Sequence, residues 1–360
     1  MSILDTIPNP EQAAISLPIL QGQKVEKQFD LSKHRITLKS KIPPLEPIIT
    51  IGGSVFAVKG DISFIAGPPK SGKTNVCAAM LASCFMNRVD DSGDLLSIES
   101  VYSNGKPVIY IDTEQPKPYT QGMIRKIMDL TGMKDEPDNL YIINMREFTT
   151  EDRRTFLGQI FDEFENEFLY FIDGITDFIA SVNDETESAE FINYLMRKSS
   201  EKKIPIICVM HENVGSGKLR GHLGSEAERK CGGSVGIRKD KEKQVHYIEA
   251  KLLRGTTDFE KVWFQWHPER KRFTLADAGV VAYMRNEDKK DPATVKKEQL
   301  EKLLKEAFGM STEIEKKALI NRLVALEGKT DKTAGRRIKD AIQADLLTLA
   351  ESGNFKLKQS

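Results

Sequence analysis

The sequence predicts an α/β protein whose mostly parallel sheet is covered by helices on both faces, followed by a small winged-helix-like domain at the C-terminus. Between Ile49 and Leu275, short apolar runs alternate with helical patterns, which is typical of βαβ units. One of these runs leads through a glycine-rich turn into a helix. Beyond residue 295, three helical patterns precede a hairpin around Ser352 and Gly353, which is the element order of a winged helix.

Hydrophobic periodicity defines the individual elements. In the body, we expect strands at 62–66, 108–112, 140–144, 168–173, 204–211, 245–253 and 262–266. We expect helices at 73–88, 120–130, 150–164 and 185–202, the last of them capped by Asn183 or Asp184. In the C-terminal domain, we expect helices at 296–308, 312–326 and 332–343 and strands at 346–350 and 354–358.

Composition divides the chain into four segments. Residues 1–48 contain scattered prolines and no sustained periodicity, which indicates an N-terminal arm, and residues 49–275 form the predicted body. Residues 276–295 are polar and are expected to be a linker before the domain at 296–360. Within the body, the stretch 213–243 is rich in glycine and basic residues, so we expect a long loop there.

Charge and cysteine content exclude several classes of protein. Lys plus Arg and Asp plus Glu both number 53, so the net charge is zero and a uniformly basic nucleic-acid-binding protein is excluded. The four cysteines show no metal-ligand spacing, which indicates reduced thiols. No apolar run reaches the roughly 18 residues of a membrane span. We therefore expect a soluble, cytoplasmic protein without a membrane partner.

The strongest motif runs from Gly67 to Thr74 and fits G-x-x-x-x-G-K-[ST], the P-loop. In such a loop, backbone N–H groups and the following helix N-terminus bind phosphate. Lys73 would reach the β- and γ-phosphates, and the Thr74 hydroxyl would bind Mg²⁺. The expected cofactors are therefore ATP and Mg²⁺, held by Gly67, Pro68, Pro69, Lys70, Ser71, Gly72, Lys73, Thr74 and Asn75. Lys70 either touches phosphate or is solvated, and solvation is favoured; a glycine-rich turn before an ordinary helix is the alternative for the whole motif.

Two carboxylates are expected to face this loop. Asp173 ends a buried strand, so it would lie at the carboxyl edge of the sheet and hold Mg²⁺ through water. The alternative is a cap for the next helix. Glu114 follows another strand, with a surface loop acid as its alternative. Asp177 is interpreted as a helix or turn carboxylate rather than a ligand.

This order of motifs resembles RecA-like ATPases, including RecA and RadA recombinases, hexameric helicases of the DnaB and plasmid RepA type, and AAA family ATPases of mobile elements. The resemblance covers roughly residues 45–275 and implies a RecA-like P-loop NTPase core. It implies that Glu114 is the general base and that His211, at a strand end, senses the γ-phosphate. A structural histidine and a surface acid remain the alternatives.

The resemblance also implies contacts outside the subunit's own nucleotide. The stretch 215–238, with Lys218 and Arg220, takes the place of a loop that lines a central channel for single-stranded DNA. Lys251 and Arg254 resemble the basic pair that reaches a neighbouring subunit's nucleotide, which implies a homo-oligomeric ring. DnaB-type helicases usually separate that pair by one residue, whereas two residues separate it here. The alternatives are a solvated loop and ordinary surface charges.

The third C-terminal helix combines an apolar face with basic residues. Ala334, Ile338, Ala341 and Ile342 are expected to face a small core, whereas Lys332, Arg336, Arg337 and Lys339 would be mostly exposed. In a helix-turn-helix protein, such a helix contacts the major groove of duplex DNA. A protein-binding module is the alternative.

Three functions fit these observations. The leading hypothesis is a ring-forming, DNA-dependent ATPase, namely a replicative-helicase-type motor of a plasmid or mobile element. The second is a nucleotide-switched DNA-binding regulatory protein without helicase activity. A small-molecule P-loop kinase is third, since neither a lid arginine nor a second substrate pocket is recognised.

We expect Lys73→Ala to abolish tight nucleotide binding, because the substitution removes the cation that faces the β- and γ-phosphates. Equilibrium titration with a fluorescent ATP analogue measures the effect. Equal affinity in the variant and the wild type would contradict the P-loop assignment.

Overall fold

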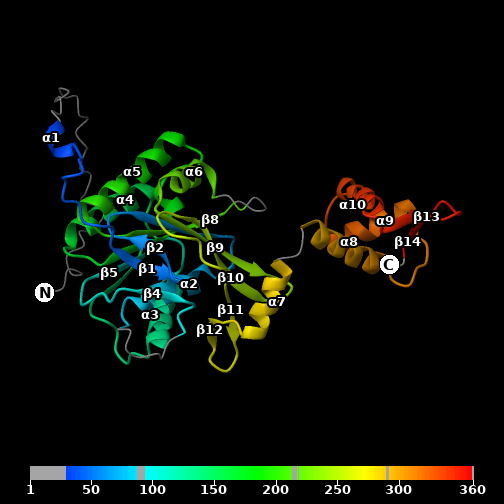
Figure 1. Cartoon of the computed structure of the whole chain (residues 1–360), viewed down its shortest axis with the longest axis horizontal. Coiled ribbons are helices and arrows are strands. Elements are labelled where there is room, and N and C mark those ends of the chain that lie inside the picture. Colours follow the sequence, from blue (N-terminus) through cyan, green and yellow to red (C-terminus); the bar gives the residue numbers. More distant parts are fainter. Residues whose placement is uncertain (1–29, 87–93, 213–216, 218, 289–291, 359–360) are drawn as a thin grey trace. The chain divides into compact units, whose positions relative to one another are not determined.

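The structure is a computed structural model that describes residues 30–86, 94–212, 217, 219–288 and 292–358. The chain divides into two units, Met1–Pro44 and Leu45–Ser360. In the described part of the first unit, α1 (Leu31–His34) is a single helical turn (Figure 1). Most of the expected arm, residues 1–29, lies outside the described residues, and the first strand already starts at Pro47.

A nine-stranded sheet forms the centre of the body within the described ranges. Its order is β12-β11-β10-β9-β3-β8-β7-β5-β6, and the pairs from β9 to β6 are parallel, which confirms a mostly parallel sheet. The edge strands β10, β11 and β12 are antiparallel. The strands are β3 (Ile62–Gly67), β5 (Val108–Asp112), β6 (Leu140–Asn144), β7 (Leu169–Asp173), β8 (Ile206–His211), β9 (Gly233–Asp240), β10 (Val245–Leu253), β11 (Val262–His267) and β12 (Arg272–Leu275).

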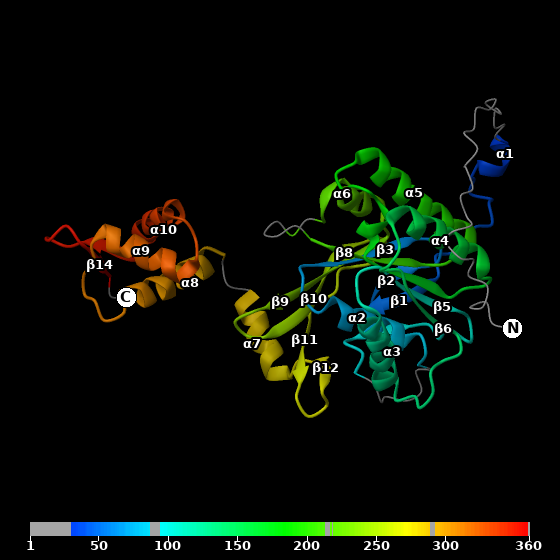
Figure 2. The same ribbon diagram turned by 180° about the vertical axis from the view of Figure 1, so that it is seen from behind.

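Helices cover both faces of this sheet, as Figures 1 and 2 show from opposite sides. One face carries α4 (Thr150–Glu163), the 3₁₀ helix η2 (Ile175–Phe178), α5 (Glu185–Lys202) and α6 (Gly221–Lys230). The other carries α2 (Lys73–Ser83), α3 (Lys117–Thr131) and a small antiparallel sheet of β1 (Pro47–Ile51), β2 (Ser54–Val58) and β4 (Ile98–Ser100). As expected, Asp184 caps α5, accepting a hydrogen bond from the Glu187 amide at 2.9 Å.

Alternation along the buried strands separates two cores. In β5, Val108 and Tyr110 belong to the apolar cluster beneath α2 and α3, whereas Ile109 and Ile111 belong to the cluster beneath α4 and α5. Because successive side chains of a strand point to opposite faces, a strand buried on both faces is apolar throughout. These strands could therefore be predicted from continuous apolar runs in the sequence.

The expected long loop at 213–243 is wrong for most of its length. The structure places α6 and β9 there, and β9 lies next to β3 in the centre of the sheet. Glycines lower the strand propensity of β9, but they are required by crowding. A β-carbon at Gly233 would lie 2.1 Å from the Phe56 carbonyl oxygen, and one at Gly236 would lie 2.9 Å from Glu249 Oε1.

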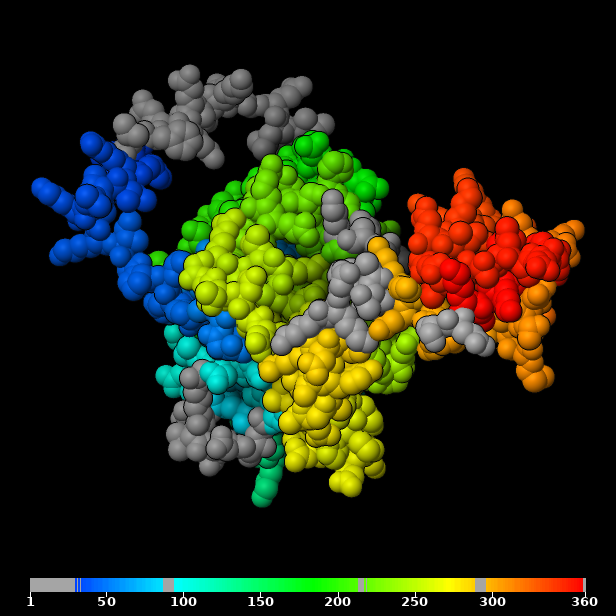
Figure 3. Space-filling view, turned by 45° about the vertical axis from the view of Figure 1, so that its right-hand side comes forward, coloured from blue at the N-terminus to red at the C-terminus, as the bar shows by residue number. Residues whose placement is uncertain are grey.

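The expected linker at 276–295 is also corrected. A helix, α7, occupies Ala278–Asp288, and its Met284 packs with Val245 and Trp263 of the sheet edge. Arg285, Asn286 and Asp288 of this helix are exposed. In the space-filling view of Figure 3, α7 and the β11–β12 hairpin form one yellow surface region.

The C-terminal module has three helices followed by a two-stranded antiparallel hairpin, which is the expected element order. Ala334, Ile338 and Ala341 are buried as predicted, but Ile342 is 47% exposed, so its assignment to the core is wrong. The identification of this module as a winged helix stays a prediction. Its elements are α8 (Pro292–Phe308), α9 (Lys316–Glu327), α10 (Asp331–Gln343), β13 (Leu347–Leu349) and β14 (Phe355–Leu357).

We expect Gly233→Ala to destabilise the protein by about 1–3 kcal/mol, because the added methyl group overlaps the Phe56 backbone. Gly122→Ala is the matched control. Gly122 lies within α3, where an added β-carbon would meet nothing within 4 Å, so this change should be neutral or stabilising. Urea unfolding midpoints measure both variants, and wild-type stability of Gly233→Ala would contradict the packing argument.

Candidate active site

A cavity of about 650 Å³ opens at the carboxyl ends of β3, β7 and β8. Ligands of open α/β sheets bind at this edge, because the loops that follow parallel strands converge there. The lining residues come from the glycine-rich loop and from segments distant in sequence, and they are Pro69, Lys70, Ser71, Gly72, Lys73, Thr74, Asn75, Glu114, Gln115, Lys126, Asp173, Val209, Met210, His211, Lys239, His246 and Phe273.

The glycine-rich loop is shaped by its two glycines. A β-carbon at Gly67 would lie 2.5 Å from the Ile237 carbonyl oxygen, so the approach of β9 requires glycine there. Gly72 has φ +105°, a left-handed conformation that glycine adopts without strain. Lys73 Nζ donates to the carbonyl oxygens of Gly67 at 2.9 Å and Pro68 at 3.1 Å. The lysine therefore folds back over the loop at the N-terminus of α2, and Lys70 is exposed.

A turn after β5 fixes the position of Glu114. The buried Asp112 carboxylate accepts hydrogen bonds from the backbone amides of Glu114 at 3.1 Å and Gln115 at 3.0 Å. Thr113 Oγ1 donates to Asp177 Oδ2 at 2.8 Å, and Asp177 is a carboxylate of the 3₁₀ helix η2. These bonds anchor the turn on both sides of Glu114.

This turn packs directly on the end of β7. Gly174, with φ +92°, follows Asp173, and a β-carbon there would lie 2.0 Å from Thr113 Oγ1. The Thr113 amide donates to the Asp173 carbonyl oxygen at 3.2 Å. The structure therefore brings Glu114 and Asp173, which are 59 positions apart in the chain numbering, to the same cavity.

His211, the last residue of β8, bridges the lysine and the glutamate. Its Nδ1 lies 3.2 Å from Lys73 Nζ, and its Nε2 lies 3.5 Å from Glu114 Oε2. Because the ammonium group can only donate, Nδ1 is the acceptor, and the ring proton lies on Nε2, facing Glu114. His211 thus lies at the end of its strand, as expected, and contacts both the lysine and the glutamate.

Burial and neighbouring charges set the ionisation of the site. Burial, together with the carboxylates of Asp112 and Glu114, raises the pKa of Asp173 to about 6. The hydrogen bond from His211 lowers the pKa of Glu114, which keeps this group ionised at neutral pH. Burial lowers the pKa of Lys73, against the attraction of Asp173.

The residues present fit a nucleoside triphosphate with Mg²⁺. Thr74 and Asp173 supply a hydroxyl and a carboxylate to the same cavity, and oxygen ligands are those that Mg²⁺ prefers. The buried Ser71 hydroxyl, within the loop, has no hydrogen-bond partner among the described residues. Thr74 and Asp173 would hold the metal ion, and Lys73 and the loop amides would hold the phosphates.

Several lining residues were not identified from the sequence. Lys126 of α3 donates to Asn75 Oδ1 at 3.0 Å, and His246 of β10 lies 2.7 Å from the Ser71 carbonyl oxygen through Nδ1. Lys239 and Phe273 reach the cavity from β9 and β12. No local motif marks these residues, since the packing of α3 and the pairing of β9, β10, β11 and β12 in the sheet are what bring them to the loop.

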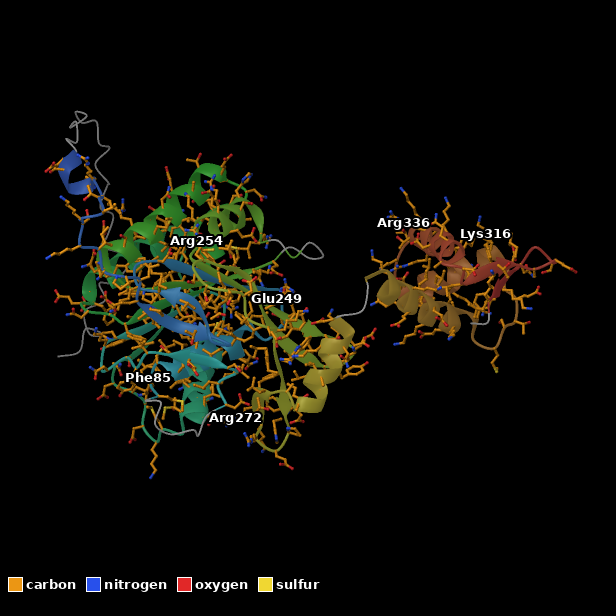
Figure 4. The ribbon with its side chains drawn as sticks, viewed as in Figure 1. Phe85, Glu249, Arg254, Arg272, Lys316 and Arg336 are labelled. Carbon is orange, nitrogen blue, oxygen red and sulfur yellow. The ribbon has the colours of Figure 1, made fainter. Side chains whose placement is uncertain are left out.

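Lys251 and Arg254 lie apart from the lining residues of this cavity in the described structure. Lys251 forms an ion pair with the buried Glu212 and donates to the Gly217 carbonyl oxygen at 2.6 Å. Arg254 donates to the Arg229 carbonyl oxygen at 3.0 Å. Figure 4 labels Arg254 just beyond β10. Their expected action on a neighbouring subunit stays a prediction.

The predicted DNA-binding residues are exposed to different extents. Lys218 lies outside the described residues, and Arg220 is exposed immediately before α6. On α10, Lys332 and Arg336 are exposed; Figure 4 labels Arg336. Arg337 is half-buried and paired with Glu327 at 3.1 Å, so the expectation that it is mostly exposed is wrong.

Other site classes find no support in the described part of the chain. Among those residues, no group of three or more His, Cys, Asp or Glu side chains could hold a metal ion. Cys77, Cys84, Cys208 and Cys231 are buried free thiols. Of the helices that the structure describes, none has the length and apolar character needed to cross a membrane.

Comparison with known proteins gave one family match. A family model described as an AAA domain matches residues 26–217, which is more than half of the 360-residue chain. The matched region contains the glycine-rich loop, Glu114, Asp173 and His211. A search of curated proteins found no match.

We expect Mg²⁺-dependent nucleotide binding to weaken as the pH falls through about 6, because a proton on Asp173 competes with the metal ion. Below that pH, the affinity attributable to this carboxylate should fall roughly tenfold per pH unit, and above it the affinity should be constant. Calorimetric titrations between about pH 5.0 and pH 8.0, a range that brackets the pKa of Asp173, measure the binding affinity.

Asp173→Asn is the control for this pH dependence, since the nucleotide phosphates also titrate. The variant should bind more weakly and retain only the dependence that belongs to the nucleotide. Identical pH profiles in the variant and the wild type would show that Asp173 does not bind the metal ion.

Proposed function

Because the chain belongs to the AAA domain family, a family of P-loop ATPases, we propose that it binds ATP with Mg²⁺, hydrolyses the nucleotide and uses this reaction to act on DNA. The observation that supports hydrolysis is the convergence of Lys73, Glu114, Asp173 and His211 on one cavity. A site that only bound phosphate would need only the loop and the lysine. A carboxylate that is ionised beside the loop adds a base for water.

The proposed reaction is an in-line attack of water on the γ-phosphate, in which the new O–P bond forms as the bond to the β,γ-bridging oxygen breaks and ADP leaves. Glu114 accepts a proton from the attacking water, and Lys73 stabilises the charge that develops on the phosphate oxygens. Thr74 and Asp173 would hold the metal ion. When bound, Mg²⁺ neutralises charge on the β- and γ-oxygens. Since His211 donates to Glu114 and accepts from Lys73, it orients the base relative to the lysine.

Coupling to DNA is proposed from the ion pairs of Glu212, the residue after His211. Glu212 is buried and pairs with Arg238 of β9 at 2.6 Å and with Lys251 of β10. Lys251 in turn donates to the backbone of Gly217, so the residues on both sides of the 213–216 segment are tied to this cluster. A rearrangement of His211 on hydrolysis would therefore be transmitted through Glu212 and Lys251 to Gly217, close in sequence to Arg220, which supports the proposed contact with single-stranded DNA.

We also propose assembly into a homo-oligomeric ring, as in replicative-helicase-type motors of plasmids or mobile elements. The resemblance to RecA-like ATPases and the position of Lys251 and Arg254 away from their own cavity support it. Measuring the particle mass by light scattering with and without a non-hydrolysable ATP analogue tests it. A monomer under both conditions would contradict this part of the proposal.

The alternative is a nucleotide-switched DNA-binding regulator without helicase activity. The observation that favours it is the C-terminal module, which has its own apolar core and presents Lys332 and Arg336 on α10. In this case, duplex DNA binding would depend on nucleotide occupancy rather than on turnover.

We expect Glu114→Gln to retain ATP binding but to lose turnover by roughly 10²- to 10⁴-fold, the usual contribution of a general base. Glu147→Gln is the matched control, because Glu147 is an exposed acid paired with Lys117. Phosphate release with and without single-stranded DNA is the measurement. Absence of ATPase activity in the wild type would contradict the proposed enzyme activity. Absence of stimulation by single-stranded DNA would contradict the proposed motor function. If the Glu114→Gln variant binds duplex DNA and the wild type does not separate its strands, the results favour the DNA-binding regulator.

A further inference from the structure

Tyr110 places a phenolic hydroxyl behind the metal-binding carboxylate. Its side chain is fully buried in β5, and its hydroxyl donates to Asp173 Oδ2 at 2.6 Å. Asp173 ends the neighbouring strand β7 and lines the cavity. A hydrogen bond of this length from a neutral hydroxyl to a carboxylate is charge-assisted and strong.

The register of the two strands makes this contact unavoidable. Tyr110 pairs with Phe171, so Asp173 is its diagonal neighbour two residues further along β7, on the same face of the sheet. The Tyr110 ring is packed in the core beneath α2 and α3, with its centroid 6.4 Å from that of Phe171. A ring held in this way can present its hydroxyl in only one direction.

We propose that Tyr110 is a positioning residue for Asp173, which holds Oδ2 of the carboxylate so that Oδ1 is the oxygen offered to the metal side of the cavity. The inference rests on the proposed function. A carboxylate can rotate about its terminal bond, and this rotation would change which of its oxygens faces the cavity. A buried hydrogen bond on the opposite oxygen prevents the rotation, in the way that outer partners orient metal ligands.

Tyr170 provides a matched control on the adjacent strand. It is also fully buried, and its hydroxyl contacts Glu167 Oε1 at 3.0 Å. It belongs to the opposite core, beneath α4 and α5, and it does not line the cavity. Tyr170→Phe therefore removes one buried hydroxyl from the same sheet without touching the metal-binding carboxylate.

The test compares Tyr110→Phe, Tyr170→Phe and the wild type in binding a fluorescent, non-hydrolysable ATP analogue while Mg²⁺ is varied, and again in EDTA. We expect Tyr110→Phe to raise the half-saturating Mg²⁺ concentration about tenfold, the lower end of the usual cost of losing an outer partner. Its affinity for the analogue in EDTA should equal that of the wild type. Tyr170→Phe should match the wild type under both conditions, and circular dichroism confirms that each variant is folded.

Three results obtained with the two tyrosine variants overturn the inference. They are an unchanged Mg²⁺ requirement in Tyr110→Phe, an equal shift in both tyrosine variants, and a loss of affinity in EDTA as large as that in Mg²⁺. A Tyr110→Phe effect that persists undiminished in an Asp173→Asn background also overturns it, since the hydroxyl would then act through another group. Failure of the proposed function is distinguishable, because in that case wild-type binding of the analogue would not respond to Mg²⁺ at all.

Discussion

The registration of four parallel strands is the constraint on which the rest of the site depends. Gly67 pairs with His211, Asp112 pairs with Asp173, and Asp173 pairs with Val209. Asp112, Asp173 and Val209 form one row across β5, β7 and β8, and the pair of His211 and Gly67 lies two residues further along β8 and β3, so every strand delivers its functional residue at the same edge. A slip of one residue in any strand would displace its group by about 3.3 Å and reverse which side chains face each core. The packing of the buried side chains in the two cores, which fixes this register, therefore also fixes the geometry of the candidate site.

Much of this arrangement could be predicted from the sequence. Each strand is a continuous apolar run that ends in a polar residue or a glycine, so both the strands and the positions of Asp173, Glu114 and His211 could be predicted from pattern and chain order. Their convergence was less accessible, because it depends on which strands are neighbours. The bridge formed by His211 between Lys73 and Glu114 required the pairing of β3 with β8, which no local pattern specifies.

The missed features share a physical cause, namely that tertiary contacts override local preference. Gly233 and Gly236 make β9 resemble a loop, although close backbone and side-chain neighbours are what exclude larger residues there. Lys126 and His246 come to the loop only through helix packing and antiparallel edge pairing. In the same way, Arg337 occupies a helical position that periodicity assigns to solvent, but Glu327 lies close enough to pair with it.

The central position of β3 has a consequence for how the chain is made. Its two neighbours, β8 and β9, both lie more than a hundred residues later in the sequence. During synthesis, the strand that carries the phosphate loop therefore has both edges unpaired until β8 has emerged, and its second edge stays unpaired until β9 has emerged at residue 240. Closing these two long loops carries an entropic cost. Antiparallel β10 then covers the outer edge of β9. The nucleotide pocket is therefore completed late, after nearly the whole body has emerged from the ribosome. Bound nucleotide would stabilise the body once it has folded and would not nucleate its folding.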